Sequence, residues 1–201
     1  MSYVEARTQK LGAIAGFTAP VLAFTCILVS IVSYPKFSWT GNALSDLGVV
    51  KGFTGPLFNF GLYTSGFLGL VFAVCGLYTY VPQRAVWKIG SLTFALASVA
   101  LIAIGAFNES FSGTHFAVSV AFFVLAPISL FILAYAYATA RQKGMAFFTV
   151  GTAIVAAIHW LVQFAVDYVP DVAIPETASG LAVSTWVICL SYVIAKKQRK
   201  F

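Results

Sequence analysis

The chain has 201 residues, of which 60% are hydrophobic and only 9% are charged. Soluble domains are about 45–50% apolar and about 25% charged, so this chain could not cover its surface with polar groups and a soluble globular protein is excluded. Twelve Lys and Arg against six Asp and Glu give a net charge of +6, which in so apolar a chain indicates membrane topology and no nucleic-acid partner.

Six apolar segments are each long enough to cross a hydrocarbon core of about 30 Å as a helix. Their length and unbroken hydrophobicity favour helices over barrel strands, which have about ten residues and alternate. The linkers after the second segment are short, so consecutive helices should pack as antiparallel neighbours. We predict an all-α polytopic membrane protein with a single six-helix transmembrane domain over residues 1–201. The predicted spans are 11–33, 55–81, 89–107, 115–139, 146–169 and 176–195.

Basic and acidic residues are distributed asymmetrically about these spans. On the side opposite the termini, Lys36 and Lys51 are the only basic residues. The positive-inside rule therefore predicts a multi-pass protein of the cell membrane with both termini in the cytoplasm. The ten basic residues on the side of the termini are Arg7, Lys10, Arg84, Lys88, Arg141, Lys143, Lys196, Lys197, Arg199 and Lys200. Five of the six acids lie at or beyond the opposite ends: Asp46, Glu109, Asp167, Asp171 and Glu176.

The connection Tyr34–Thr54 is the one loop long enough to have structure of its own, and loops of this length are usually functional or disordered. Its composition favours a short helix or re-entrant turn that ends at Gly48. In one interpretation Asn42 and Asp46 face inward over the mouth of the bundle; in the other the loop is an interfacial anchor with Trp39 at the lipid headgroups. The inward interpretation brings the loop toward three polar residues of the spans: Asn59, Glu109 and His115.

The fifth span carries an ionisable residue deep in the membrane. Thr152, His159, Gln163 and Asp167 share one helical face. At ~1.5 Å per residue, His159 is about 15 Å from the end of its span, near the bilayer midplane. Ionisable groups at that depth are costly and mark a site by default, although a neutral imidazole bonded to a neighbouring hydroxyl is the alternative.

Other spans carry stripes of small and polar residues, such as Ser119 with Ala126 and Gly180 with Ser184. We interpret these stripes as helix-packing surfaces. The more polar residues predict a pocket that opens to the extracytoplasmic side. The candidate catalytic residues are His159, His115, Asp46 and Glu109. The candidate substrate-binding residues are Asn42, Asn59, Gln163, Trp39, Asp167 and Glu176.

A family resemblance is carried by the loop motif Phe37-Ser-Trp-Thr-Gly-Asn-Ala-Leu-Ser-Asp-Leu-Gly48 and by Leu57-Phe58-Asn59. The motif resembles the domain-of-unknown-function 998 family of prokaryotic, especially archaeal, membrane proteins. The later stretches Gly113-Thr-His115, Phe122-Phe123 and Ala126-Pro127-Ile128-Ser129 look like that family too. The resemblance covers most of the chain. It implies a six-helix module and a candidate site at Asn42, Asp46, Asn59 and His115, and it implies no reaction.

A looser likeness is to ceramidase-type intramembrane hydrolases, which use Ser, Asp and three His on a catalytic zinc. This chain has two His, and Gln163 stands one turn after His159, where that superfamily would have a second His. A catalytic zinc requires three protein ligands and an open position. We therefore predict no resident metal and identify no cofactor; His115 and His159 would be ligands only if a metal such as zinc is present.

Three functions are compatible with these patterns. One is an enzyme acting on a lipid or lipid-linked substrate, with His159 or His115 as general base or metal ligand and Asp46 or Glu109 as its partner. A second is a carrier of a small solute, because Ala19–Phe24 echoes Ala126–Phe131 as in transporters with inverted repeats. A third is a non-catalytic subunit or organiser of a membrane complex. The expected partners are membrane lipids and either another membrane protein or a second copy of the chain.

Overall fold

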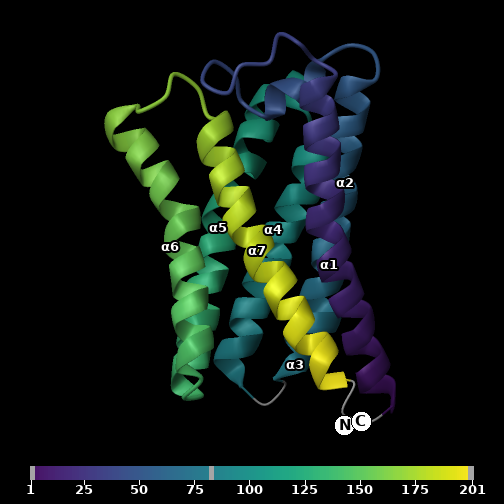
Figure 1. The fold of residues 1–201 in the computed structure, drawn as a ribbon, viewed down its shortest axis with the longest axis vertical. Helices are drawn as coiled ribbons and strands as arrows, with labels where there is room; N and C mark the ends of the chain where they lie inside the picture. The colour runs from purple at the N-terminus through teal and green to yellow at the C-terminus, as the bar shows by residue number, and fades with distance from the viewer. Residues whose placement is uncertain (1–2, 82–83, 199–201) are drawn as a thin grey trace.

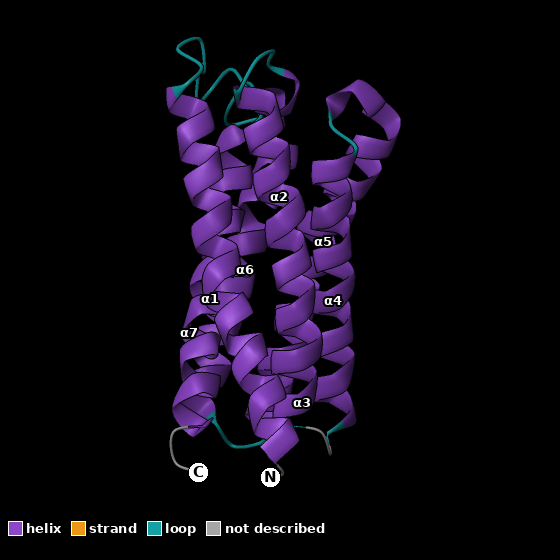
Figure 2. Cartoon of the chain, turned by 90° about the vertical axis from the view of Figure 1, so that its right-hand side faces the viewer, coloured by secondary structure: helices purple, strands orange, loops and turns teal. Residues whose placement is uncertain are grey.

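The computed structural model describes residues 3–81 and 84–198, and the regular secondary structure within these residues is entirely helical. The long helices are α1 (Tyr3–Val32), α2 (Thr54–Val71), α4 (Ala85–Ala106), α5 (Ser112–Thr139), α6 (Lys143–Val166) and α7 (Ala173–Gln198). Directly after α2 come the π-helix η2 (Phe72–Leu77) and the short helix α3 (Tyr78–Tyr80). Two 3₁₀-helices, η1 (Ser45–Val49) and η3 (Glu109–Phe111), lie in connections. Figure 2 shows the helices running along the molecule and the loops gathered at its two ends.

Six helices in the described part of the chain are long and apolar enough to cross a membrane. The second of them is continuous from Thr54 to Tyr80 and so includes α2, η2 and α3. The predicted all-helical, six-span architecture is therefore confirmed.

The six spans form a ring in chain order. Each long helix packs against the next, and α7 closes the ring by packing against α1. The start of α1 and the end of α7 lie at one end of the bundle, and the long connection after α1 lies at the other (Figure 1). We call the end that carries residues 33–53 the loop end.

Small residues let the helices approach closely, as is usual in membranes. A Cβ at Gly12 would collide with the backbone of Gly76. Rings fill the interior beside these contacts: Phe72 is fully buried and packs edge-on against Phe94 and Trp186.

The π-helix η2 shifts the hydrogen-bond register of the second span, and side chains satisfy carbonyls near it. Trp87 Nε1 donates to the Leu77 carbonyl at 2.6 Å, and Gln9 Nε2 donates to the Thr79 carbonyl at 2.8 Å. A backbone carbonyl left without a partner in hydrocarbon would cost several kcal/mol (~2–7). The irregular turn is therefore fixed by its neighbours on α4 and α1.

Some helix ends differ from the predicted span ends. Polar residues extend one helix into water, and a residue in a left-handed conformation ends another helix early. The first span begins at Tyr3 rather than at residue 11, and Arg7 and Lys10 are exposed on its first turns. The fifth ends at Val166 rather than at 169, because Asp167 adopts a left-handed conformation with φ 45°. Hydropathy marks the apolar part of a helix, whereas hydrogen bonding continues beyond it.

Candidate functional site

The connections at the loop end are joined into one layer. The Asp171 N–H donates to the Thr40 carbonyl at 3.1 Å, and the Ala173 N–H donates to the Asn42 carbonyl at 3.0 Å. The loop between α6 and α7 therefore lies along the long loop after α1. We call residues 33–53, 107–111 and 167–172 together the loop cap.

Asn42 and Asp46 form a local pair that shapes the long loop before η1. Asn42 Nδ2 donates to Asp46 Oδ2 at 2.6 Å, and the Ala43 N–H donates to the same oxygen at 3.1 Å. The Ser38 N–H in turn donates to Asn42 Oδ1 at 2.9 Å. η1 ends at Val49, one residue beyond the predicted end at Gly48. Both polar residues thus stabilise the turn that leads into η1.

Two glutamates connect the same turn to the bundle. The Leu44 N–H donates to Glu176 Oε2 at 2.6 Å, and Ser45 Oγ donates to Glu109 Oε1 at 2.6 Å. Glu176 lies in the first turn of α7 and Glu109 opens η3. These hydrogen bonds join elements that are far apart in the sequence.

The carboxylates of the loop cap lie within electrostatic reach of one another. Glu109 interacts with Asp46 and with His115, and Glu176 interacts with Glu109, Asp46 and Asp171. No Lys or Arg in the described part of the chain forms an ion pair with any of them. Several carboxyl groups therefore gather at this end of the bundle, and no described Lys or Arg is paired with them.

His115 and Asn59 contact the backbone of the loop cap. His115 is 7% exposed, and its Nδ1 lies 2.7 Å from the Phe107 carbonyl. Because a carbonyl only accepts, Nδ1 is the donor in this hydrogen bond. Asn59 Nδ2 donates to the Gly48 carbonyl at 2.8 Å, so Asn59 holds the end of η1.

The three remaining candidate residues lie in the loop cap or on α6 beside it. Gln163 is 6% exposed; its Nε2 donates to the Val169 carbonyl at 2.8 Å, and the Val169 N–H donates back to Oε1 at 3.4 Å. Trp39 is 43% exposed and packs edge-on against Phe37 at 5.3 Å between ring centroids. Asp167 is exposed at the end of α6. Gln163 therefore fastens the loop that follows α6.

His159 lies apart from these groups. It is half-buried on α6 and forms no hydrogen bond or ion pair with any other described residue. The adjacent Trp160 packs against Phe123, with ring centroids 4.6 Å apart. The structure thus brings Asp46, Glu109, Glu176 and His115 together and leaves His159 outside their network.

No group of three or more His, Cys, Asp or Glu side chains within residues 3–81 and 84–198 is arranged to hold a metal ion. His115 and His159 stand on different helices, α5 and α6. A catalytic zinc takes three protein ligands, and the described residues offer no such set.

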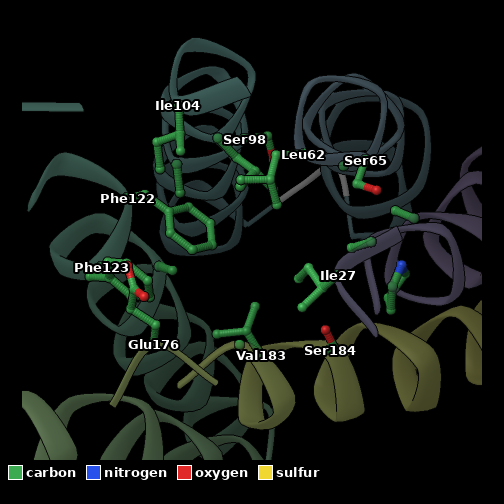
Figure 3. Close-up of a pocket in the computed structure, with 18 of the residues that line it drawn as sticks. Ile27, Leu62, Ser65, Ser98, Ile104, Phe122, Phe123, Glu176, Val183 and Ser184 are labelled. Carbon is green, nitrogen blue, oxygen red and sulfur yellow. The ribbon is translucent and has the colours of Figure 1, made fainter. Parts of the chain in front are cut away.

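A cavity of about 130 Å³ lies between the helices below the loop cap (Figure 3). Its described lining comes from α1, α2, α4, α5, α7 and the turn at Leu44 and Ser45, whereas α6 contributes none of it. Ile27, Leu62 and Val183 are typical of its mostly apolar wall. Glu176 is the one ionisable side chain among the described residues that line it.

Hydroxyl groups interrupt the apolar wall. Ser65 Oγ and Thr177 Oγ1 are buried and have no hydrogen-bond partner in the described structure. Ser184 also lines the cavity, and its hydroxyl faces the cavity in Figure 3. Sequence reasoning missed these residues and Ser45 as site residues. The stripes Ser119–Ala126 and Gly180–Ser184 were the available signal, since all four residues line the cavity.

The replacement Gln163→Leu is expected to loosen the loop 167–172, because two backbone groups of Val169 lose their partners. Each buried unsatisfied group costs about 1–3 kcal/mol. Hydrogen exchange followed by mass spectrometry should show faster exchange in that loop and unchanged exchange in α2. Phe164→Leu on the exposed side of the same helix is the control; equal exchange rates in both variants would contradict the assigned role.

Comparison with models of protein families finds one family, described as "Protein of unknown function (DUF998)", over residues 17–193. No curated protein and no solved structure gives a significant match. The matched region includes the long loop, the cavity and parts of all six spans. The resemblance read from the loop motif is confirmed, and the chain belongs to the DUF998 family.

Proposed function

We propose that this membrane protein binds a lipid or lipid-linked amphiphile, with an apolar chain in the interhelical cavity and the polar end at the loop cap. The observation that carries the proposal is the cavity itself. Its wall is apolar along α1, α2 and α4, and at the loop cap it reaches the Glu176 carboxylate and the Ser45 hydroxyl. An apolar site with a few convergent polar groups is the usual form of a small-molecule pocket.

The size of the cavity indicates how much of a ligand it accepts. Its volume of about 130 Å³ is close to that of an engineered apolar cavity of roughly 150 Å³ that binds benzene. Complete ligand pockets are usually about 300–1,000 Å³. The cavity therefore accepts a segment of one chain, and the rest of the molecule extends past Phe123 and Glu176, which lie together at one side of it (Figure 3).

The same geometry favours binding over catalysis by histidine. α6, with His159, does not border the cavity, and His115 does not line it either. His115 also uses Nδ1 to hold the Phe107 carbonyl. A general base must come within hydrogen-bond reach of the proton that it removes, so neither imidazole is placed to act on a ligand in this cavity.

We also infer that the loop end is extracytoplasmic and that both termini are cytoplasmic in the cell membrane. The inference rests on charge: Arg7, Lys10 and Lys197 belong to the end where α1 begins and α7 ends. Arg199 and Lys200 lie outside the described residues. Basic residues accumulate on the cytoplasmic side of membrane proteins.

The orientation is tested by labelling single cysteines in a variant without Cys26, Cys75 and Cys189. Lys51→Cys is at the loop end and Lys143→Cys is at the other end, and both lysines are exposed. A membrane-impermeant maleimide should label position 51 on intact cells and position 143 only after permeabilisation. The reverse pattern would overturn the inferred orientation.

The binding proposal is tested by filling the cavity with Ser184→Phe. The aromatic ring should exclude a bound chain, so native mass spectrometry of the purified full chain should show lipid-mass adducts reduced at least about fivefold. The control is Cys189→Phe, which adds the same ring to an exposed position of α7. Equal adducts on the two variants, with melting temperatures equal to the parent, would contradict the proposal.

A further inference from the structure

The two carboxyl groups at the loop end of the cavity have no Lys or Arg partner among the described residues. Glu176 and Glu109 each receive a hydrogen bond from a neutral donor, the Leu44 N–H and the Ser45 hydroxyl. Neither is ion-paired with a described Lys or Arg, and Lys36 and Lys51 are exposed. A carboxylate removed from water is strongly destabilised unless an opposite charge and hydrogen bonds compensate it.

Unpartnered hydroxyls line the same cavity. Ser65 is only 2% exposed, and Thr177 directly follows Glu176 on α7. Neither hydroxyl oxygen has a partner in the described structure. Buried polar groups are almost always hydrogen-bonded, and an exception requires an explanation such as a missing ligand. The cavity therefore has hydroxyls without a hydrogen-bond partner in its wall and a carboxyl group at its end.

The polar headgroup of a ligand therefore determines which amphiphile the cavity binds. Lipid tails are as apolar as Leu side chains, so a chain that moves from the bilayer into the cavity gains little from the hydrophobic effect. All single-chain amphiphiles would fit the apolar wall about equally well. Discrimination then depends on the groups around Glu176.

We propose that the ligand is a single-chain amphiphile with a protonated amine headgroup, which donates to the Glu176 carboxylate and to the neighbouring hydroxyl of Thr177. An ammonium group has three N–H donors and no acceptor, which matches a site that offers carboxyl and hydroxyl oxygens. Its positive charge would also supply the opposite charge that a buried carboxylate requires. The carboxyl groups of Glu109 and Asp46 lie in the loop cap on the same side of the site. The headgroup assignment rests on the proposed function, because it requires the chain to occupy the cavity.

The experiment compares three twelve-carbon amphiphiles that differ only at the polar end: dodecylamine, dodecanol and dodecanoate. Each is added to the purified full chain in detergent, and the bound fraction is measured by native mass spectrometry. The amine should bind at least about tenfold more tightly than the alcohol, which corresponds to about 1.4 kcal/mol. The carboxylate should bind more weakly than the alcohol, because it is repelled by the loop cap.

The charge contribution is isolated with Glu176→Gln, which keeps an acceptor for the Leu44 N–H and removes the charge. This variant should lower the preference for amine over alcohol at least about fivefold and leave alcohol binding unchanged. Glu5→Gln is the control, since it removes one negative charge near the start of α1. Its preference should equal that of the parent.

The outcomes distinguish the amine assignment from the proposed function of the cavity. Equal binding of all three amphiphiles, abolished by Ser184→Phe, would keep the cavity as a binding site and overturn the amine assignment. An unchanged preference for the amine over the alcohol in Glu176→Gln would overturn the amine assignment as well. No binding of any of the three would instead contradict the proposed function. If Glu176→Gln does not fold, the three-ligand series on the unaltered chain still decides the assignment.

Discussion

The hydrogen bond from the Leu44 N–H to Glu176 joins the long loop after α1 to the first turn of α7. It lies where the chain leaves its helices, so it satisfies a backbone donor that no helix could satisfy. The same carboxylate lines the cavity. The position of the long loop and the chemistry of the cavity therefore both involve the Glu176 side chain.

The energetics of a membrane cavity differ from those of a pocket in a soluble protein. In water, each buried methylene contributes about 0.8 kcal/mol, whereas a chain taken from the bilayer starts in an equally apolar environment. The apolar wall of Ile27, Leu62 and Val183 therefore contributes little to affinity, which depends on polar contacts. Affinity would then depend on a small set of polar groups in the loop cap and at the start of α7: Ser45, Glu109, Glu176 and Thr177.

The six-span architecture could be predicted from the sequence because hydropathy reports how long each apolar segment is. Short linkers place consecutive helices side by side, which is compatible with the observed ring. The turn ending near Gly48 was predictable from composition. The grouping of Asp46 with Glu109 and His115 corresponds to one of the two interpretations of the long loop, which composition alone could not distinguish. The position of His159 relative to the cavity could not be predicted. Helical phase identifies the polar face of α6, but the helices that enclose a cavity are decided by packing, and α6 lies outside that set. The unpartnered hydroxyls of Ser65 and Thr177 could not be predicted either, because a hydroxyl in a helix ordinarily bonds to a carbonyl of the preceding turn.

The most direct test of a ligand-filled cavity is an experimental structure of the full chain grown from a lipid mesophase. The account predicts a continuous elongated density that passes between Leu62 and Val183 and ends within hydrogen-bond distance of the Glu176 carboxylate. Ordered lipid chains on the outer surface of the bundle, together with an interior that is empty or closed by side chains, would contradict it.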